Sequence, residues 1–155
     1  MSNSSKRREF IRSAVKTGGI AGMAAMALAV PARTQGGRIE RTQAGVRVGN
    51  LIFTSGLTGV IKGAPNDSGG TIEEQTRSIL ERHKANLEAA GTSLDNVLKV
   101  TVFMSDIRSN RPGMNQVYAE YFKSARPSRS AVGVEFPDER TKVEIEMIAW
   151  VPEPA

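Results

Sequence analysis

The chain has 155 residues, a formal net charge of +5, one histidine and no cysteine. Its length suits one domain with a hydrophobic core, and the lack of cysteine excludes disulfides, a thiolate nucleophile and a cysteine-based metal site. Four of the five net positive charges lie in residues 1–32, so the remainder is nearly neutral. A nearly neutral domain offers no electrostatic surface for a nucleic acid.

Residues 1–32 predict an export signal of the twin-arginine type. A basic run at residues 6–12 contains two adjacent arginines. The uncharged stretch that follows, residues 17–30, is shorter than the roughly 20 residues of a membrane-spanning helix. We expect cleavage after Ala32, a periplasmic location and no stable membrane span afterwards. An uncleaved anchor or a basic tail is the alternative.

The chain after the signal begins with polar residues and then becomes β-rich. Residues 33–43 predict a linker that ends in a short edge strand, ahead of a domain over residues 44–155. Two β-rich runs within residues 46–55 flank a Gly-Asn turn and predict a hairpin. Glycine, proline and asparagine are frequent in residues 61–70, which predicts a loop.

A helix is predicted next, with clear start and stop signals. Thr71 and Glu74 fit a capping box at its start, and Gly91 fits the position just beyond its end. Apolar residues recur between them at helical spacing. His83, the single histidine, lies on this apolar stripe, so we expect a core or rim residue and no transition-metal site.

The remaining elements predict an α+β domain with two layers. Residues 97–104 are rich in β-branched side chains and predict a buried strand, and a second helix is expected from about 114 to 122. Residues 129–134 and 142–151 predict the last two strands. This order implies a mixed sheet with both helices on one face. The bare face needs a cover, and another copy of the chain is the obvious one.

An arginine and two glutamates stand on the last two predicted strands. Arg129 begins one strand, and Glu144 and Glu146 lie two apart on the next, which places both acids on one face. A guanidinium can hold a carboxylate through two parallel hydrogen bonds, and a glutamate can hold or deprotonate a water molecule. The combination fits a small substrate that carries a carboxylate. Spacing alone also allows a surface cation and a solvated acidic face.

Short motifs between about Arg41 and Ala149 match a known pattern. They are Gly-Val-Arg-Val-Gly-Asn-Leu-Ile-Phe-Thr-Ser-Gly at 45–56, Glu-Ala-Ala-Gly at 88–91, Lys-Val-Thr-Val-Phe-Met at 99–104, Asn-Gln-Val-Tyr at 115–118, Pro-Ser-Arg-Ser-Ala-Val at 127–132 and Lys-Val-Glu-Ile-Glu at 142–146. In these motifs the chain resembles the YjgF/RidA family, whose studied members hydrolyse reactive 2-imino and 2-enamino acids. The resemblance implies a chorismate-mutase-like fold and a homotrimer with a central β-barrel and active sites between subunits.

The resemblance also implies roles for particular residues. Arg129 would hold the substrate carboxylate, and Glu144 would contact the ligand and the attacking water, while Glu146 would be structural. Four further residues would bind the substrate, Ala131 through its backbone N–H: Ser55, Gly56, Asn115 and Ala131. Tyr118, Tyr121 and Phe122 are expected in the core or an interface.

The expected activity is hydrolytic deamination of 2-imino and 2-enamino acids to 2-oxo acids and ammonia, without a metal or organic cofactor. The chain departs from the family pattern at three places. Thr42 stands where a pocket tyrosine is common, and Leu-Thr-Gly at 57–59 replaces the usual Gln-Ile-Pro after Ser-Gly. Glu135 and Phe136 replace a small or basic residue and an aliphatic one. These changes are expected around the cleft and affect substrate selection. The alternative is a non-catalytic trimer of the periplasm that binds small carboxylates.

Overall fold

The computed structural model describes residues 38–153, and the predicted signal peptide at 1–32 lies outside them. The strands and helices follow in this order: β1 (Ile39–Thr42), β2 (Gly45–Val48), β3 (Leu51–Thr54), β4 (Leu57–Thr58), α2 (Ile72–Ala89), β5 (Val97–Met104), α3 (Ile107–Tyr121), β6 (Ser128–Gly133) and β7 (Val143–Trp150). Short 3-10 turns precede α2 (Pro65–Asp67) and β5 (Leu94–Asn96). Within the described residues, no helix has the length and apolar character needed to cross a membrane.

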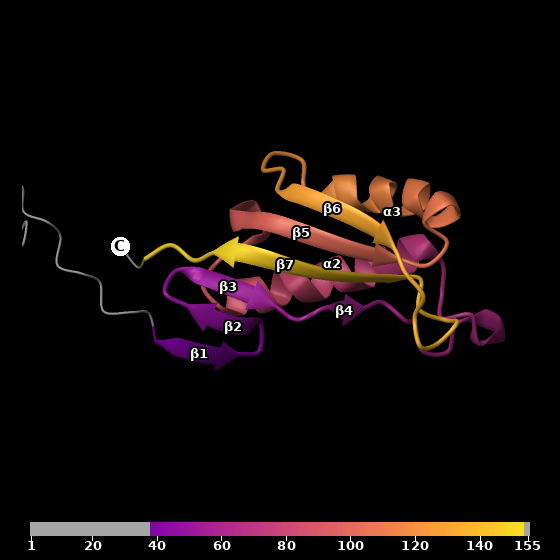
Figure 1. Cartoon of the computed structure of the whole chain (residues 1–155), viewed down its shortest axis with the longest axis horizontal. Coiled ribbons are helices and arrows are strands. Elements are labelled where there is room, and N and C mark those ends of the chain that lie inside the picture. The colour runs from indigo at the N-terminus through magenta and orange to yellow at the C-terminus, as the bar shows by residue number, and fades with distance from the viewer. Residues whose placement is uncertain (1–37, 154–155) are drawn as a thin grey trace, which may run out of the picture. The chain divides into compact units, whose positions relative to one another are not determined.

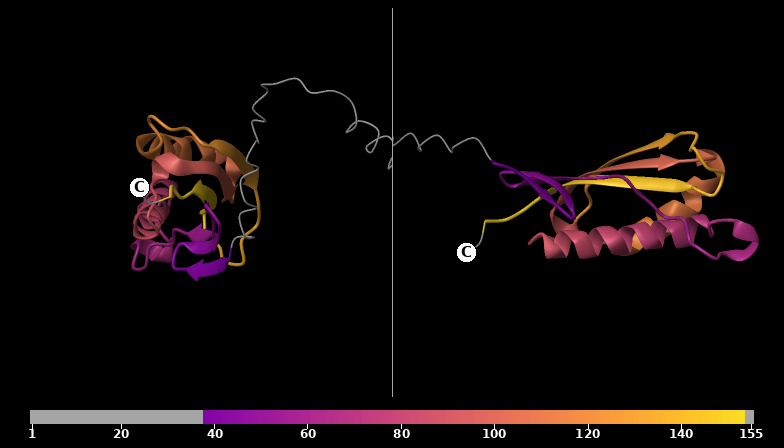
Figure 2. Two further views of the ribbon diagram at one scale, coloured as in Figure 1. Left: turned by 90° about the vertical axis from the view of Figure 1, so that its left-hand side faces the viewer. Right: turned by 90° about the horizontal axis from the view of Figure 1, so that it is seen from below.

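The strands form one mixed sheet in the order β1-β2-β3-β7-β5-β6, and β4 pairs with β7 next to β3 (Figure 1). β5 and β6 run parallel, and the other pairs are antiparallel. Both helices lie on the same side of this sheet (Figure 2). The predicted α+β class, with a mixed sheet and two helices on one face, is confirmed. β1 is the edge strand expected at the end of the linker.

The hydrophobic core lies between the helices and one face of the sheet. On β7, Val143, Ile145 and Met147 are buried, and the residues between them are partly exposed. The same alternation continues on β5, where Val100 and Val102 are fully buried. Alternate side chains of a strand point to opposite faces, so one face of each strand forms the core. Burial of this apolar surface is the main source of stability.

Local sequence signals set both ends of α2. The Thr71 hydroxyl accepts a hydrogen bond from the Glu74 N–H, and the Glu74 carboxylate accepts one from the Thr71 N–H. This reciprocal pair is the predicted capping box. Gly91 follows the last turn with φ of +80°, a conformation that glycine adopts at little cost. Both predicted boundaries of this helix are confirmed.

The start of α3 was predicted wrongly. The sequence predicted residues 114–122, whereas the helix spans Ile107–Tyr121 and includes Pro112. Proline lacks the N–H that bonds to the carbonyl four residues earlier, and the adjacent Gly113 also weakens the helical pattern. Packing outweighs these local costs, because a Cβ on Gly113 would lie 2.8 Å from Ile72 of α2. Glycine thus allows the two helices to approach closely.

The sheet face opposite α2 and α3, called the open face below, carries apolar side chains without a cover in the single chain. Phe53 and Trp150 are 45% and 43% exposed. Other large apolar residues on this face are also exposed: Ile39, Val46, Val48 and Val132. An apolar surface of this kind is typical of a contact with another protein chain.

Candidate functional site

Arg129 lies on β6, at an edge of the sheet, and points to the helix-covered side. Its guanidinium carbon lies 4.4 Å from the centre of the Tyr118 ring on α3. Its Nη1 lies 4.0 Å from the sulfur of Met114, a weak contact. The aromatic face attracts the cation and orients the guanidinium without using its N–H donors on a carboxylate. Arg129 is therefore prepared to bind an anion.

A cavity of about 340 Å³ adjoins this arginine, and we call it the Arg129 cavity. Its lining consists of Asn115, Tyr118, Ala119, Phe122, Arg126, Pro127 and Arg129. Its volume is near the lower end of the roughly 300–1,000 Å³ of small-molecule sites. The lining combines aromatic rings, two cations and an amide, which suits a small anionic ligand.

Two buried polar atoms in this lining lack a partner. Among the described residues, neither the Tyr118 hydroxyl nor Oδ1 of Asn115 has a hydrogen bond. Buried polar groups are nearly always paired, so each has capacity for a ligand. Burial raises the pKa of Tyr118 to about 12, against the opposing effect of the Arg129 charge. The hydroxyl therefore keeps its proton near neutral pH and can donate a hydrogen bond.

Glu144 lies on β7 and its carboxylate covers Gly56. A Cβ built on Gly56 would collide with Oε1 of Glu144. Glycine is therefore required here because the glutamate occupies the space next to it. The expected role of Gly56 in substrate binding stays a prediction. Ser55, the preceding residue, is exposed. The structure thus brings Glu144, Gly56 and Ser55 together, as one part of the predicted site.

Arg129 and Glu144 lie on opposite faces of the sheet. Arg129 is level with Val100 of β5, whereas Glu144 is level with Phe103. Positions three apart on a strand point to opposite faces. Val100 is fully buried under the helices, so Arg129 faces the helices and Glu144 belongs to the open face. One chain does not bring the two predicted catalytic residues to a common point.

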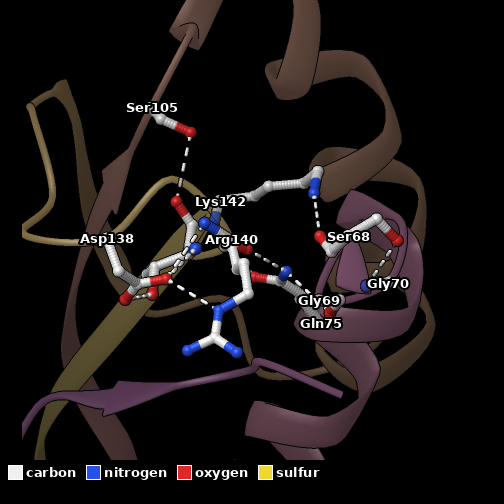
Figure 3. A network of polar contacts seen from close by, with 9 residues as sticks. Ser68, Gly69, Gly70, Gln75, Ser105, Asp138, Arg140 and Lys142 are labelled. Carbon is white, nitrogen blue, oxygen red and sulfur yellow. Dashed lines mark hydrogen bonds and ion pairs between the residues drawn. The ribbon is translucent and has the colours of Figure 1, made fainter. Parts of the chain in front are cut away.

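A buried glutamine fixes the chain just before Glu144 (Figure 3). Nε2 of Gln75 donates to the carbonyls of Gly69 and Arg140, at 2.9 and 2.7 Å. Its Oε1 accepts from the N–H of Lys142 at 2.9 Å. The side chain thereby ties α2, the loop before it and the start of β7 together. Because Lys142 is two residues before Glu144, this network helps to set the position of the glutamate.

The other predicted site residues are spread over the structure. Ala131 is on β6, on the same face as Arg129, and packs against the core. Asn115 was expected to open the second helix, but it lies well inside α3 and lines the Arg129 cavity. Thr42 is exposed, and its hydroxyl donates to the Gly45 carbonyl at 3.2 Å. Its hydrogen bond therefore stays within its own hairpin.

Glu135 and Phe136, the two residues after β6 that depart from the family pattern, do not line the Arg129 cavity of the same chain. Glu135 lines a separate cavity of about 560 Å³ together with Asp106 and Arg108. Phe136 is partly buried and does not line the Arg129 cavity. Within one chain, Glu135 and Phe136 therefore lie apart from the Arg129 cavity, because β6 runs away from Arg129 before they occur. The expectation concerned a cleft between subunits and stays a prediction.

Two residues of the cavity were missed as ligand contacts by sequence reasoning. Tyr118 was assigned to the core or an interface, and it is indeed mostly buried, but it also lines the cavity. Its spacing of three from Asn115 on one helix places both on the same side and could have indicated this role. Arg126 was not considered, and a second arginine three residues before Arg129 was the available signal.

His83 is a core residue, as predicted. It is buried, and its Nε2–H donates to the carbonyl of Ile145 at 2.9 Å. Burial lowers its pKa, despite the opposing effect of this hydrogen bond, and the Arg82 charge lowers it further. Within residues 38–153, no group of three or more histidine, aspartate or glutamate side chains could hold a metal ion.

Comparisons with known proteins identify the family. The profile described as Endoribonuclease L-PSP matches residues 39–151. The chain belongs to this family, which includes the YjgF and RidA proteins. A RutC family protein of Pyrococcus horikoshii is 42% identical over 105 residues, which are 68% of this chain and 82% of the relative.

Two further relatives bear on activity and fold. A protein named 2-iminobutanoate/2-iminopropanoate deaminase from Dermatophagoides farinae is 34% identical over 106 residues, covering 68% of this chain and 82% of the relative. The crystal structure of a putative endoribonuclease from Thermotoga maritima is 41% identical with a TM-score of 0.61. That match covers 71% of this chain and 86% of the other. The family therefore includes proteins named as imine deaminases and others named as endoribonucleases.

Proposed function

We propose that the protein is a hydrolytic deaminase that converts reactive 2-imino and 2-enamino acids to 2-oxo acids and ammonia. The observation that carries the proposal is Arg129, which lies over the Tyr118 ring in a small cavity and makes no ion pair with the described residues. Membership of the family, with relatives named as deaminases of this kind, supports the same reaction.

Substrate binding would begin at Arg129. Its guanidinium would hold the carboxylate of the imino acid through two parallel hydrogen bonds. The Tyr118 hydroxyl, unpaired among the described residues, would donate to a carboxylate oxygen, and Oδ1 of Asn115 would accept from the imine N–H. The backbone N–H of Ala131 is a further candidate donor. These contacts would fix the position of the C=N carbon.

Glu144 would then direct a water molecule to that carbon. The carboxylate takes a proton from water as the oxygen bonds to carbon, and the C=N electron pair moves to nitrogen, which is protonated. The resulting carbinolamine, whose nitrogen has received the proton held by Glu144, breaks its C–N bond when Glu144 passes the hydroxyl proton to that nitrogen and the hydroxyl becomes the carbonyl. Ammonia leaves and a 2-oxo acid remains. The proton balance closes within substrate, water and Glu144, so this scheme includes no metal or organic cofactor.

This reaction requires two copies of the chain. Because Arg129 and Glu144 lie on opposite faces, a shared site would combine the Arg129 cavity of one subunit with Glu144, Gly56 and Ser55 of the next. A homotrimer, with open faces lining a central barrel, would cover the exposed apolar residues and create three such sites. The apolar open face supports this assembly.

The test is imine hydrolysis by the purified protein. An amino-acid oxidase would generate 2-imino acids, and release of the 2-oxo acid would be followed. The protein should accelerate release, and Arg129→Ala should abolish the acceleration with an unchanged circular dichroism spectrum. Arg111→Ala removes an exposed cation of α3 and serves as the matched control. A fully active Arg129→Ala variant would exclude this mechanism.

A second candidate is a non-catalytic trimer that retains small carboxylates. It is favoured by Thr42, which offers no phenol to the site and bonds within its own hairpin. Saturable binding of a 2-oxo acid without acceleration of imine hydrolysis would support it. Endoribonuclease activity is disfavoured, because the only histidine is buried against Ile145 and the chain after the predicted signal is nearly neutral.

We also propose export to the periplasm by the twin-arginine route, based on the basic and uncharged runs within residues 1–32. Cell fractionation of the full chain tests this. The twin-arginine prediction expects a shortened protein in the periplasm, and replacement of Arg7 and Arg8 by lysine should retain it in the cytoplasm. Unchanged export of this variant would contradict the assignment.

A further inference from the structure

A second cation lines the Arg129 cavity, and the proposed mechanism leaves it without a role. Arg126 and Arg129 are both part of the lining, which includes no aspartate or glutamate. Neither arginine forms an ion pair with the described residues. Two guanidinium groups at one small cavity make it more positive than one substrate carboxylate requires.

The two arginines differ in position. Arg129 is partly buried and held over Tyr118, whereas Arg126 is exposed and precedes Pro127. Proline restricts the backbone of the residue before it, so Arg126 projects from a constrained position. The inner arginine is suited to the carboxylate next to the reacting carbon, and the outer one to a group further along the substrate.

The chemistry of a guanidinium limits what that group can be. Arginine remains charged at all relevant pH values and prefers carboxylate or phosphate partners, which it can bind through two hydrogen bonds. An aliphatic side chain would offer Arg126 nothing and would displace part of its hydration. A second carboxylate would pair with it and fits a cavity of this small size.

We propose that the cavity selects a 2-imino acid with a second carboxylate on its side chain, and that Arg126 is the residue that determines this specificity. The inference rests on the proposed deaminase function and narrows its substrate class. Arg129 holds the carboxylate beside the C=N carbon, and Arg126 holds the distal carboxylate. The hydrolysis itself is unchanged: water replaces nitrogen, ammonia leaves, and the product is a 2-oxo dicarboxylic acid.

The experiment compares substrates that differ only in the distal carboxylate. Imines of glutamate and of 2-aminopentanoate would be produced at matched rates by oxidases suited to each amino acid. The full-length protein should give a kcat/KM for the acidic imine about ten-fold higher or more, as expected for a charge-assisted contact. Arg126→Gln should reduce this ratio to near one, and Arg126→Lys should restore part of it. Lys123→Gln, which removes an exposed cation outside the cavity lining, should leave the ratio unchanged.

A binding measurement separates this inference from the proposed function. Calorimetry would compare 2-oxoglutarate with 2-oxopentanoate, which has the same chain length and one carboxylate fewer. Tighter binding of 2-oxoglutarate that depends on Arg126, without turnover of any imine, would uphold the selective cavity and reject the deaminase. Turnover with equal kcat/KM values and equal binding would uphold the deaminase and overturn the role of Arg126. An unchanged ratio in Arg126→Gln, accompanied by loss of assembly in analytical ultracentrifugation, would also overturn it and assign Arg126 to a subunit contact.

Discussion

On β7, side chains that point to the helices alternate with side chains that point to the open face, and the two sets differ in burial and chemistry. Val143 and Ile145 are fully buried in the core, whereas Glu144 and Glu146 are partly exposed and Trp150 is 43% exposed. The helix-covered set holds the fold together. The open set consists of carboxylates and apolar side chains that are not covered by other parts of the same chain. On this strand, odd-numbered residues therefore belong to the core, and even-numbered residues lie on the face to which we assign assembly and catalysis.

Among substitutions on the two faces of β7, Glu144→Gln should produce the largest change, and the quantity that changes is the rate of imine hydrolysis. General base catalysis contributes about a hundred-fold to ten-thousand-fold, and the amide cannot accept a proton from water. Imine hydrolysis should fall by that factor, while the unfolding curve stays unchanged because the residue is outside the core. Glu146→Gln, two residues further on the same face, is the matched control and should remain active. Equal losses in both variants, with the assembly of both unchanged in analytical ultracentrifugation, would show that Glu144 has no special role.

A pair of isoleucines on β7 compares the two faces directly. Ile145 is fully buried under the helices, and Ile148 is on the open face. Ile145→Ala should lower the free energy of unfolding by about 2–5 kcal/mol through loss of core packing. Ile148→Ala should leave the stability of the isolated chain nearly unchanged but weaken self-association. Urea denaturation and analytical ultracentrifugation would measure the two effects, and a large loss of stability without dissociation in Ile148→Ala would contradict the division between the faces.

Gln75→Leu should have a smaller effect. Gln75 joins α2 and the loop before it to the start of β7, which carries residues of both faces. It would leave the Lys142 N–H without its acceptor, and the carbonyls of Gly69 and Arg140 without this donor (Figure 3). A buried group left unpaired costs about 1–3 kcal/mol. We expect that loss in urea denaturation, together with a reduced kcat as β7 shifts near Glu144. Ser78→Ala, on the same helix but outside the network, is the control and should change neither quantity.

The smallest predicted effect is a pH dependence that arises on the helix-covered face. Burial lowers the pKa of His83, so the unfolded chain binds a proton more readily than the folded chain. The stability contributed by neutral His83 is present above the unfolded pKa of about 6.5 and is lost as the pH falls toward the folded value. The slope should not exceed about 1.4 kcal/mol per pH unit. Urea denaturation between pH 7.5 and 5.5 would measure it, and an equal slope in His83→Gln would assign the effect to other groups.

The elements that the sequence predicted well are those with local signals. The β2–β3 hairpin follows from its Gly-Asn turn, and α2 from the Thr71 capping box and Gly91. The start of α3 was missed because Pro112 and Gly113 argue against a helix locally, whereas packing on α2 favours one. Tertiary contacts outweighed propensity at that point.

For the candidate site, the sequence predicted the residues but not how they are placed relative to each other. Residue types and spacing, with the family resemblance, identified Arg129 and Glu144, but their relation depends on the pairing of β5 with β6 and β7. Because strand register is a long-range property, local sequence did not reveal that the two residues face opposite ways. The space that Glu144 occupies over Gly56 was hidden for the same reason.

Mixing two inactive variants tests most directly whether the site is shared between copies. Arg129→Ala and Glu144→Gln subunits would be unfolded together in equal amounts, refolded, and assayed for imine hydrolysis. In a homotrimer with sites between subunits, about a quarter of the sites would combine an intact Arg129 with an intact Glu144, so activity should return to about that fraction of the unmutated protein. A mixture that contains verified hybrid trimers and remains as inactive as its parents would contradict a site shared between the two faces.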